Sequence, residues 1–428
     1  MQLTFQILPL WILGLTVLAS GCGQMTSRSS EKVSIKVVSK QDETPFFARL
    51  ATNHERIVVA PSQSIVAGGH TFELPDHEDL FFVEIDNADA AKISSEIFRS
   101  GRVVVFSARD EREAFLLASR FGLTAHPRKI DLSEIKNPSA QQSPESVSNL
   151  SILSTPIKGL DIDPLRMRED LESLSGARPI VIDGQQHTLT NRASVDNKAK
   201  ARAWLKTAYE ALGFRVSEHR YSSGVNLVAE KRPANPVDDQ IIMVSGHLDT
   251  VQTAGADDDG SGTISSLTIA RALAGKDLRR TVRFVAFDEE ERGLVGSTAY
   301  ARDLNKSGEM SKINLINIEM TGYDSDNDGA FHTIDCNENT SSSLSQALLQ
   351  TISRDGIPLK KIDACTNRSD HAVFWEYDRP AIVVSQNFFG GDGNPCYHRT
   401  CDTVQKVNWT YMEKMTRAAA NTVYGLTK

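Results

Sequence analysis

The chain has 428 residues, of which 40% are hydrophobic and 24% are charged, and its formal net charge at pH 7 is −8. This length leaves room for two domains and a full-sized hydrophobic core, and the composition is ordinary for a globular protein. The negative charge, together with the lack of any basic block in the sequence, argues against non-specific nucleic-acid binding. The sequence gives no indication of the oligomeric state.

The first 22 residues form a segment of their own. Residues 7–18 are an apolar run that is too short to span a membrane comfortably and is typical of a signal peptide. Residues 18–22 read Leu-Ala-Ser-Gly-Cys, which resembles a bacterial lipobox with lipid attached to Cys22. We therefore expect residues 1–22 to direct export and Cys22 to anchor the protein to the bacterial cell envelope. A secretory signal that leaves the protein free in solution is the alternative.

Residues 23–135 predict a small α/β domain. Strand-like runs occupy residues 33–38, 56–60, 79–85 and 102–108, and helical periodicity occupies residues 88–100 and 111–121. Residues 136–156 are rich in Ser, Gln, Asn and Pro, and we therefore expect a linker over residues 136–160. The position of the small domain before a cleavable linker suggests a propeptide-like role, either covering a cleft or assisting folding.

Residues 161–428 predict a larger α/β domain in which short apolar strands alternate with helices. The strands lie at 241–244, 282–287, 315–320 and 381–385, and the helices at 165–174, 195–212, 262–273, 294–305, 342–354, 371–377 and 408–426. Continuously apolar strands separated by helices favour a mostly parallel sheet covered by helices on both faces. Ligands in such folds gather at the carboxyl ends of the strands.

Polar residues with metal-binding chemistry follow these strands. His247 comes just after one strand, Glu290 just after the next, and Glu319 ends a third, where a lone buried carboxylate is costly without a cation. Asp249, two residues after His247, can fix the tautomer of that histidine and raise its basicity.

Further carboxylates and a second histidine complete the set. Asp258 is the middle acid of a triplet in a Gly-rich turn, Glu291 is adjacent to Glu290, and His398 lies in a loop near the C-terminus. The four positive charges of two Zn²⁺ ions would be balanced by the negative charges of three ligand carboxylates and one hydroxide. Oxygen and imidazole ligands without thiolates suit a catalytic zinc site better than a structural one.

Cysteine usage is consistent with export. Besides Cys22 the chain has four cysteines, which permit two disulfides in three possible pairings in an oxidising compartment. A bridge between Cys396 and Cys401, which flank His398, would stiffen that loop.

Five motifs together closely resemble the secreted di-zinc aminopeptidases, the family of bacterial leucyl aminopeptidase and yeast aminopeptidase Y. The motifs are residues 246–249 (Gly-His-Leu-Asp), 255–262 (Gly-Ala-Asp-Asp-Asp-Gly-Ser-Gly), 290–297 (Glu-Glu-Arg-Gly-Leu-Val-Gly-Ser), 368–371 (Arg-Ser-Asp-His) and 394–398 (Asn-Pro-Cys-Tyr-His). The resemblance covers roughly residues 163–428 and leaves out the first domain.

The resemblance implies a role for each metal-site residue. His247 and Glu319 would bind one zinc, Glu291 and His398 the other, Asp258 would bridge the two ions, and Glu290 would be the general base. The family's chemistry is hydrolysis of the first peptide bond by a water molecule that bridges two zinc ions. Many of its aminopeptidases have Asp where this chain has Glu319, and the longer side chain is associated with carboxypeptidases.

Two alternatives therefore stand beside an aminopeptidase acting on peptide substrates. One is a zinc carboxypeptidase of the same fold, suggested by Glu319. The other is a non-catalytic binding ectodomain, against which the complete ligand set argues.

A calcium site is a separate possibility. Asp324, Asp326 and Asp328, with Asp335 at the twelfth position, match the spacing of a calcium-binding loop. The loop follows a strand rather than a helix and its twelfth residue is not Glu. An Asx-rich turn is therefore the preferred interpretation.

Overall fold

A computed structural model of the chain describes residues 32–39, 48–51, 55–61, 69–74, 78–85, 91–93, 95–100, 102–121, 127–130, 132, 160–338 and 341–428. The predicted signal segment with Cys22 and nearly all of the predicted linker lie outside these ranges. Within them, no helix is both long and apolar enough to cross a membrane.

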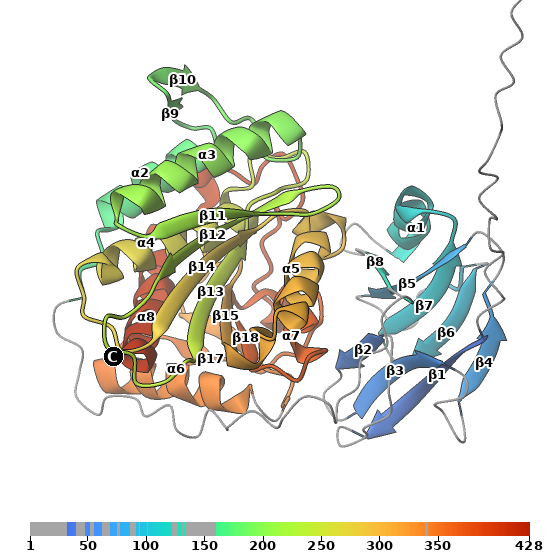
Figure 1. Cartoon of the computed structure of the whole chain (residues 1–428). Helices are drawn as coiled ribbons and strands as arrows, with labels where there is room; N and C mark the ends of the chain where they lie inside the picture. The colour runs from blue at the N-terminus through green and yellow to red at the C-terminus, as the bar shows by residue number, and fades with distance from the viewer. Residues whose placement is uncertain are drawn as a thin grey trace, which may run out of the picture.

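In the residues that the structure describes, the N-terminal domain has two antiparallel sheets and the helix α1, and it stands beside the larger domain (Figure 1). Its sheets have the strand orders β2-β3-β1-β4 and β6-β7-β5-β8. The elements are β1 (Lys32–Ser39), β2 (Ala48–Ala51), β3 (Glu55–Pro61), β4 (His70–Glu73), β5 (Asp79–Glu84), β6 (Glu96–Ser100), β7 (Val103–Ala108), α1 (Glu111–Ala118) and β8 (Arg128–Lys129).

The helix predicted over residues 88–100 is wrong, because its described C-terminal part is strand β6, paired antiparallel with β7. Ile97 and Phe98 pack against the core that the two sheets share. Packing against non-local neighbours outweighs a short helical pattern here.

The larger domain is built on an eight-stranded mixed sheet in the order β11-β12-β14-β13-β15-β18-β16-β17. Its four central strands, β14-β13-β15-β18, are parallel to one another. The strands are β11 (Arg215–Arg220), β12 (Val225–Lys231), β13 (Ile241–His247), β14 (Thr281–Phe287), β15 (Ile313–Ile318), β16 (Ala330–Ile334), β17 (Lys360–Lys361) and β18 (Ala381–Gln386). A small hairpin, β9 (Ile180–Ile182) with β10 (Gln185–His187), stands apart from this sheet.

The helices begin and end within one or two residues of their predicted positions. They are α2 (Pro164–Leu174), α3 (Val195–Ala211), α4 (Gly262–Ala274), α5 (Val295–Lys306), α6 (Ser342–Asp355), α7 (His371–Trp375) and α8 (Trp409–Thr427). Three start at side-chain caps: Asp163, Ser194 and Asn408 each accept a hydrogen bond from a backbone N–H in the first turn.

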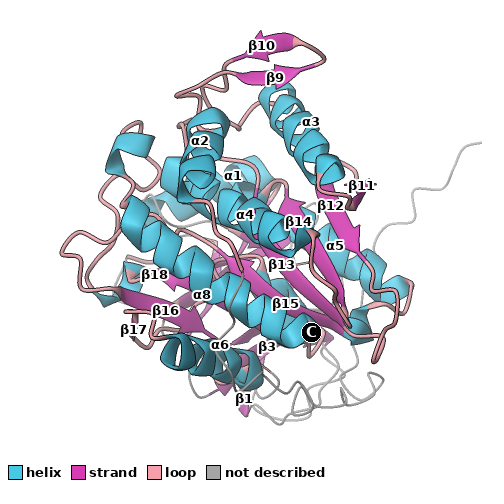
Figure 2. Ribbon diagram, turned by 90° about the vertical axis from the view of Figure 1, so that its left-hand side faces the viewer, coloured by secondary structure: helices cyan, strands magenta, loops and turns pink. Residues whose placement is uncertain are grey.

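Helices cover both faces of the central sheet. Helix α4 packs on β13, β14 and β15 with α8 beside it, in the view of Figure 2, while α7 packs on β15 and β18 from the other side. Along β13, Ile242 and Val244 enter the core beneath α4, whereas Ile241 and Met243 enter the core beneath α7. This alternation explains why four consecutive residues of the strand, 241–244, are apolar. The predicted α/β fold with a helix-covered sheet is therefore confirmed.

Candidate functional site

Three neighbouring parallel strands end at one edge of the sheet and place three predicted site residues there. His247 is the last residue of β13, Glu319 directly follows β15, and Glu290 opens the short helical turn η6 (Glu290–Arg292) shortly after β14. Because these strands are adjacent in the order β14-β13-β15, the three side chains come from side-by-side positions.

Asp258 lies between two pairs of predicted ligands. Its Oδ1 is 3.1 Å from Nε2 of His247, and its Oδ2 is 3.1 Å from Nε2 of His398. The same His398 nitrogen is 3.1 Å from Oε2 of Glu291, and the His247 nitrogen is 3.9 Å from Oε1 of Glu319. The five side chains thus form two histidine–glutamate pairs with one aspartate shared between them.

The site concentrates buried negative charge. Burial raises the pKa of Glu319 to about 7 and the pKa of Glu290 well above its usual value. Burial acts in the same direction on Asp258, but hydrogen bonds from His247 and His398 lower the pKa of its carboxyl group instead. Divalent cations would neutralise such a cluster. The available donors are imidazole nitrogens and carboxylate oxygens, which fit a catalytic zinc centre.

The two acids beside Asp258 hold the backbone around the site. The Asp259 carboxylate accepts hydrogen bonds from the backbone N–H groups of His247 and Met320, each at 3.0 Å. The peptide bond between Asp258 and Asp259 is cis. One flanking acid therefore fixes the strand ends that present His247 and Glu319.

Asp257 and Asp402 connect the acidic turn to the C-terminal loop. The Asp257 carboxylate accepts a hydrogen bond of 2.7 Å from Nδ2 of Asn394, in the loop that leads to His398. Asp402 accepts hydrogen bonds from the backbone N–H groups of Asp257 and Asp258, at 2.9 and 3.1 Å. Sequence reasoning assigned no role to Asp257, Asp259 or Asp402, since only the folded chain brings their partners together.

Arg192 is fully buried and braces the same loops. Its guanidinium donates hydrogen bonds to four backbone carbonyl oxygens, those of Leu174, Leu248, Ala254 and Gly255, at distances of 2.6 to 3.2 Å. Three of these carbonyls lie between His247 and Asp258 in the sequence. A lone arginine before a helix carries no sequence signal, so this residue could not have been found without the structure.

Asp249 contacts both His247 and the turn η6. Nδ1 of His247 is 3.1 Å from the backbone oxygen of Asp249 and 3.6 Å from its carboxylate. The two carboxylate oxygens accept hydrogen bonds from the backbone N–H groups of Glu290 and Glu291, at 3.0 and 3.2 Å. Asp249 therefore holds the turn η6 in addition to facing His247.

The backbone is strained at three points of the site. Glu289, Met320 and His398 have φ angles of 61°, 50° and 57°, in the left-handed region that non-glycine residues seldom adopt. Each is a predicted ligand or lies next to Glu290 or Glu319. Such strain tends to gather at functional sites, where the surrounding structure enforces it.

The four cysteines of the larger domain form two disulfides. Cys396 pairs with Cys401, with the Cα atoms 5.2 Å apart, and so closes the short loop that contains His398. Cys336 pairs with Cys365, with the Cα atoms 4.9 Å apart, at the start of the segment that leads to Ser369.

A narrow recess of about 40 Å³ opens beside Glu319. Its apolar walls are Met320, Ile334, Val383, Phe388, Phe389 and Tyr397. Arg368 also lines it, with the guanidinium 5.7 Å from the centre of the Phe389 ring.

The acidic loop before β16 contains three of the four predicted calcium ligands. Oxygen atoms of Asp324, Asp326 and Asp328 lie within 4.8 Å of one another. Asp335 is not in this group, because it follows β16 while the other three precede it. Asp326 accepts a hydrogen bond from the N–H of Asp328, and Asp328 one from the N–H of Ala330. These contacts favour the Asx-rich turn.

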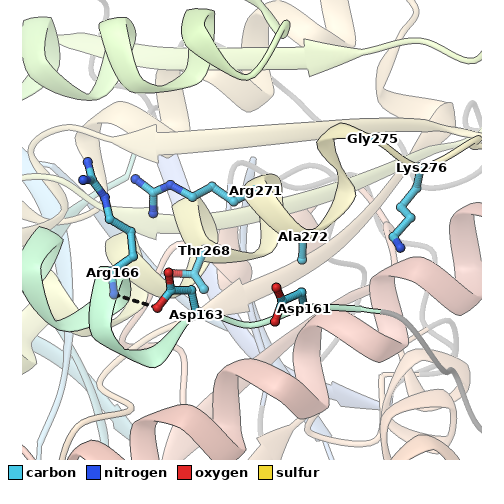
Figure 3. A pocket seen from close by; sticks show the side chains of 8 residues that line it. All are labelled: Asp161, Asp163, Arg166, Thr268, Arg271, Ala272, Gly275 and Lys276. Atoms are coloured by element: carbon cyan, nitrogen blue, oxygen red, sulfur yellow. Dashed lines mark hydrogen bonds between the residues drawn. The ribbon is translucent and has the colours of Figure 1, made fainter.

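A second hollow, of about 340 Å³, lies where α2 meets α4 (Figure 3). Two of its charged side chains have structural partners: Asp163 caps α2 by accepting a hydrogen bond from the N–H of Arg166, and Arg271 lies 2.5 Å from Asp170. We assign no catalytic role to this hollow.

Comparisons with known proteins agree with this geometry. Residues 226–423 match the model of Peptidase family M28. Aminopeptidase YwaD of Bacillus subtilis is 30% identical over 212 residues, which make up 47% of this chain and 45% of YwaD. The chain spans about half the length of the curated relatives it matches. The resemblance to aminopeptidases drawn from the motifs is confirmed.

Two solved structures share the fold. The LapA aminopeptidase of Legionella pneumophila has a TM-score of 0.64 and 20% identity, over 82% of this chain and 98% of that one. The zinc aminopeptidase BSAP of Bacillus subtilis has a TM-score of 0.55 and 15% identity, over 63% of this chain and 96% of that one. The LapA match covers more of the chain than residues 161–428 make up, so it extends into the N-terminal domain.

Proposed function

We propose that this chain is a zinc-dependent exopeptidase, and specifically an aminopeptidase that removes N-terminal residues from peptides. The observation that supports this most directly is the position of Asp258, with one carboxylate oxygen toward His247 and the other toward His398. An aspartate placed between two histidine–glutamate pairs suits a carboxylate shared by two metal ions.

In this proposal His247 and Glu319 hold one zinc ion, Glu291 and His398 hold the other, and Asp258 binds both. Two zinc ions held by these residues would lower the pKa of a bound water molecule and would polarise the carbonyl group of the scissile bond. The protein contributes the orientation of its ligands, through the backbone hydrogen bonds of Asp249, Asp259 and Asp402 described above.

Glu290 is the proposed general base. It is adjacent to the ligand Glu291, is 7% exposed, and has a raised pKa because it is buried. Its carboxylate would accept a proton from the attacking water and donate it to the leaving amine as the peptide bond breaks. The buried carboxylates around it would attract the free ammonium group of a substrate, which favours cleavage after the first residue.

The recess beside Glu319 would receive the side chain of that first residue. Its walls are mostly aliphatic and aromatic, so we expect a preference for apolar over acidic first residues.

A carboxypeptidase is the second candidate. Arg368 lines the same recess, and a guanidinium group is a suitable partner for the carboxylate at the end of a peptide. The presence of Glu rather than Asp at position 319, which is associated with carboxypeptidases, also supports this second candidate.

One assay separates these functions. Protein without residues 1–22 would be stripped of metal, restored with zinc, and given one peptide in free, N-acetylated and C-amidated forms. Loss of the first residue, blocked by acetylation and dependent on zinc, is the expected result. Trimming blocked by amidation would establish the carboxypeptidase, and a lack of cleavage in all three forms would favour a binding role.

A matched pair of variants tests the general base. Glu290→Gln should lower kcat by at least 100-fold, the range seen for loss of a general base, while zinc binding remains. Glu289→Gln is the control, because Glu289 is in the same turn but its carboxylate contacts Lys198, Ser223 and Arg292. Similar losses in both variants would refute the assignment.

We also propose that the protein is exported and anchored by lipid at Cys22. The lipobox-like sequence at residues 18–22 supports this, and two disulfides are in keeping with an oxidising compartment.

A further inference from the structure

The N-terminal domain contacts the larger domain through two buried polar groups. Glu84, the last residue of β5, is 7% exposed, and its Oε2 accepts hydrogen bonds from the N–H of Asn367 at 2.8 Å and from Oγ1 of Thr366 at 3.2 Å. Arg128, in β8, forms a buried ion pair with Glu376, which directly follows α7. Buried charged groups of this kind are strongly destabilising when their partners are lost.

The segment that Glu84 contacts continues to Ser369, which hydrogen-bonds the proposed zinc ligand Glu319. Ser369, two residues after Asn367, donates a hydrogen bond from Oγ to Oε2 of Glu319. Asn317 joins this contact, because its Nδ2 lies 3.1 Å from the same Glu319 oxygen and 2.7 Å from Oγ of Ser369. Residues 366–369 thus join a hydrogen-bonded contact with the N-terminal domain to a hydrogen-bonded contact with Glu319.

Residues 362–368 have no regular secondary structure, so their shape depends on contacts with other segments. The disulfide at Cys365 holds the middle of this segment, and the hydrogen bond from Ser369 to Glu319 holds the residue that follows it. Between these points, the Glu84 carboxylate accepts hydrogen bonds from two consecutive residues. Arg368, which lines the recess, follows immediately.

The same domain also reaches the turn that contains Glu290 and Glu291. Gly293, just after η6, has φ +97°, and a Cβ atom there would lie 2.4 Å from the carbonyl oxygen of Pro127. Nη2 of Arg292 is 2.9 Å from Glu111 at the start of α1. The domain therefore contacts both segments that hold the glutamates of the site.

We propose that Glu84 is a positioning residue for Glu319, and that the N-terminal domain is a lasting part of the catalytic unit rather than a removable cover. This inference rests on the proposed zinc peptidase. Glu84 acts through residues 366–369: its carboxylate fixes Thr366 and Asn367, and thereby keeps Ser369 against Glu319.

The test compares Glu84→Gln with Asp79→Asn. Asp79 is in the same strand, β5, but its carboxylate pairs with Lys129 inside the N-terminal domain. The neutral amide of the Glu84 variant should weaken zinc binding, measured against a competing chelator, by about 10-fold, the lower end of the range for lost support of a metal ligand. It should lower kcat more than it raises KM, and Asp79→Asn should change neither. If both variants lose thermal stability and keep the zinc affinity of the wild type, the inference is wrong.

A second measurement keeps the test decisive if Glu84→Gln does not fold. A protease site placed within residues 136–156 would be cut after the intact protein has folded. The two pieces should elute together and keep their zinc. Separation of the pieces with unchanged zinc affinity in residues 161–428 would overturn the inference. Because zinc binding is read without a peptide, wild-type protein that binds zinc but cleaves nothing would refute the proposed function alone.

Discussion

Replacing Arg192 by methionine should destabilise the larger domain and loosen its metal site together. Methionine fills much of the same volume but cannot donate hydrogen bonds. The carbonyl groups of Leu174, Leu248, Ala254 and Gly255 would each lose a buried, positively charged donor.

The structure sets the expected size of the effect. A hydrogen bond to a charged group contributes roughly 1.5–3 kcal/mol, but the desolvation of Arg192 opposes the sum of four such bonds. Leaving a buried acceptor without its donor costs about 1–3 kcal/mol, so the four carbonyl groups together set a loss of at least about 4 kcal/mol. We therefore expect a loss of about 4 kcal/mol, which lowers the urea midpoint by about 1.3 M if the slope is about 3 kcal/mol per M.

The assay is urea unfolding of metal-free protein, so that zinc binding does not contribute to the midpoint. Tryptophan fluorescence reports on the larger domain, because three of the four tryptophans, Trp204, Trp375 and Trp409, lie in residues 161–428, and protein without residues 1–22 lacks the fourth, Trp11. Arg168→Met is the control. Arg168 is exposed and pairs with Glu172, so its loss should cost less than about 1 kcal/mol.

Zinc affinity supplies the second readout. Since Arg192 holds the backbone between His247 and Asp258, Arg192→Met should weaken zinc binding, while Arg168→Met should not. A midpoint within about 0.2 M of the wild type, a small fraction of the shift expected from the urea slope, would refute the reasoning.

Three further predictions follow from single features. Replacing Cys396 and Cys401 by alanine should cost about 2 kcal/mol, the value for closing so short a loop, and weaken zinc binding at His398; an unchanged zinc affinity would show that the bridge is not needed there. Burial lowers the pKa of His371 from 6.5 to about 3, so the folded state binds fewer protons than the unfolded state, and the stability that is present above pH 6.5 is lost as the pH falls toward 3. Between pH 7 and pH 5 this loss in the free energy of unfolding is about 2 kcal/mol. In His371→Gln, the free energy of unfolding measured with urea should fall by about 2 kcal/mol less between these two pH values. Cys22→Ser should abolish incorporation of radiolabelled fatty acid in a bacterial host and release the protein from the membrane fraction; labelling that persists would disprove the lipid anchor.

The sequence contained enough information for the central fold. The strands at the centre of the large sheet are mostly apolar, and the helices that alternate with them have apolar residues at helical spacing, so both follow from local pattern. The strands at the margins, β11, β12, β16 and β17, were not predicted. Strand β6 was mistaken for a helix, because its conformation depends on pairing with β7 rather than on its own pattern.

Most residues of the candidate site could also be identified from local sequence pattern, and one could not. His247, Asp258, Glu290, Glu291 and Glu319 could be identified because each follows a strand or lies in a distinctive motif, and parallel strands bring their carboxyl ends together. A free-standing loop histidine such as His398 was recognised only through a family motif.

What the sequence determined by itself is the identity and order of these side chains, since their types and spacing are local properties. Only the tertiary structure decided what holds them in place: Arg192 on four carbonyl groups, Asp259 on the ends of two strands, and Glu84 from another domain. Those partners are far apart along the chain, and a hydrogen bond between distant residues leaves no periodicity in either segment. Such supports become visible only once the fold has brought them within bonding distance.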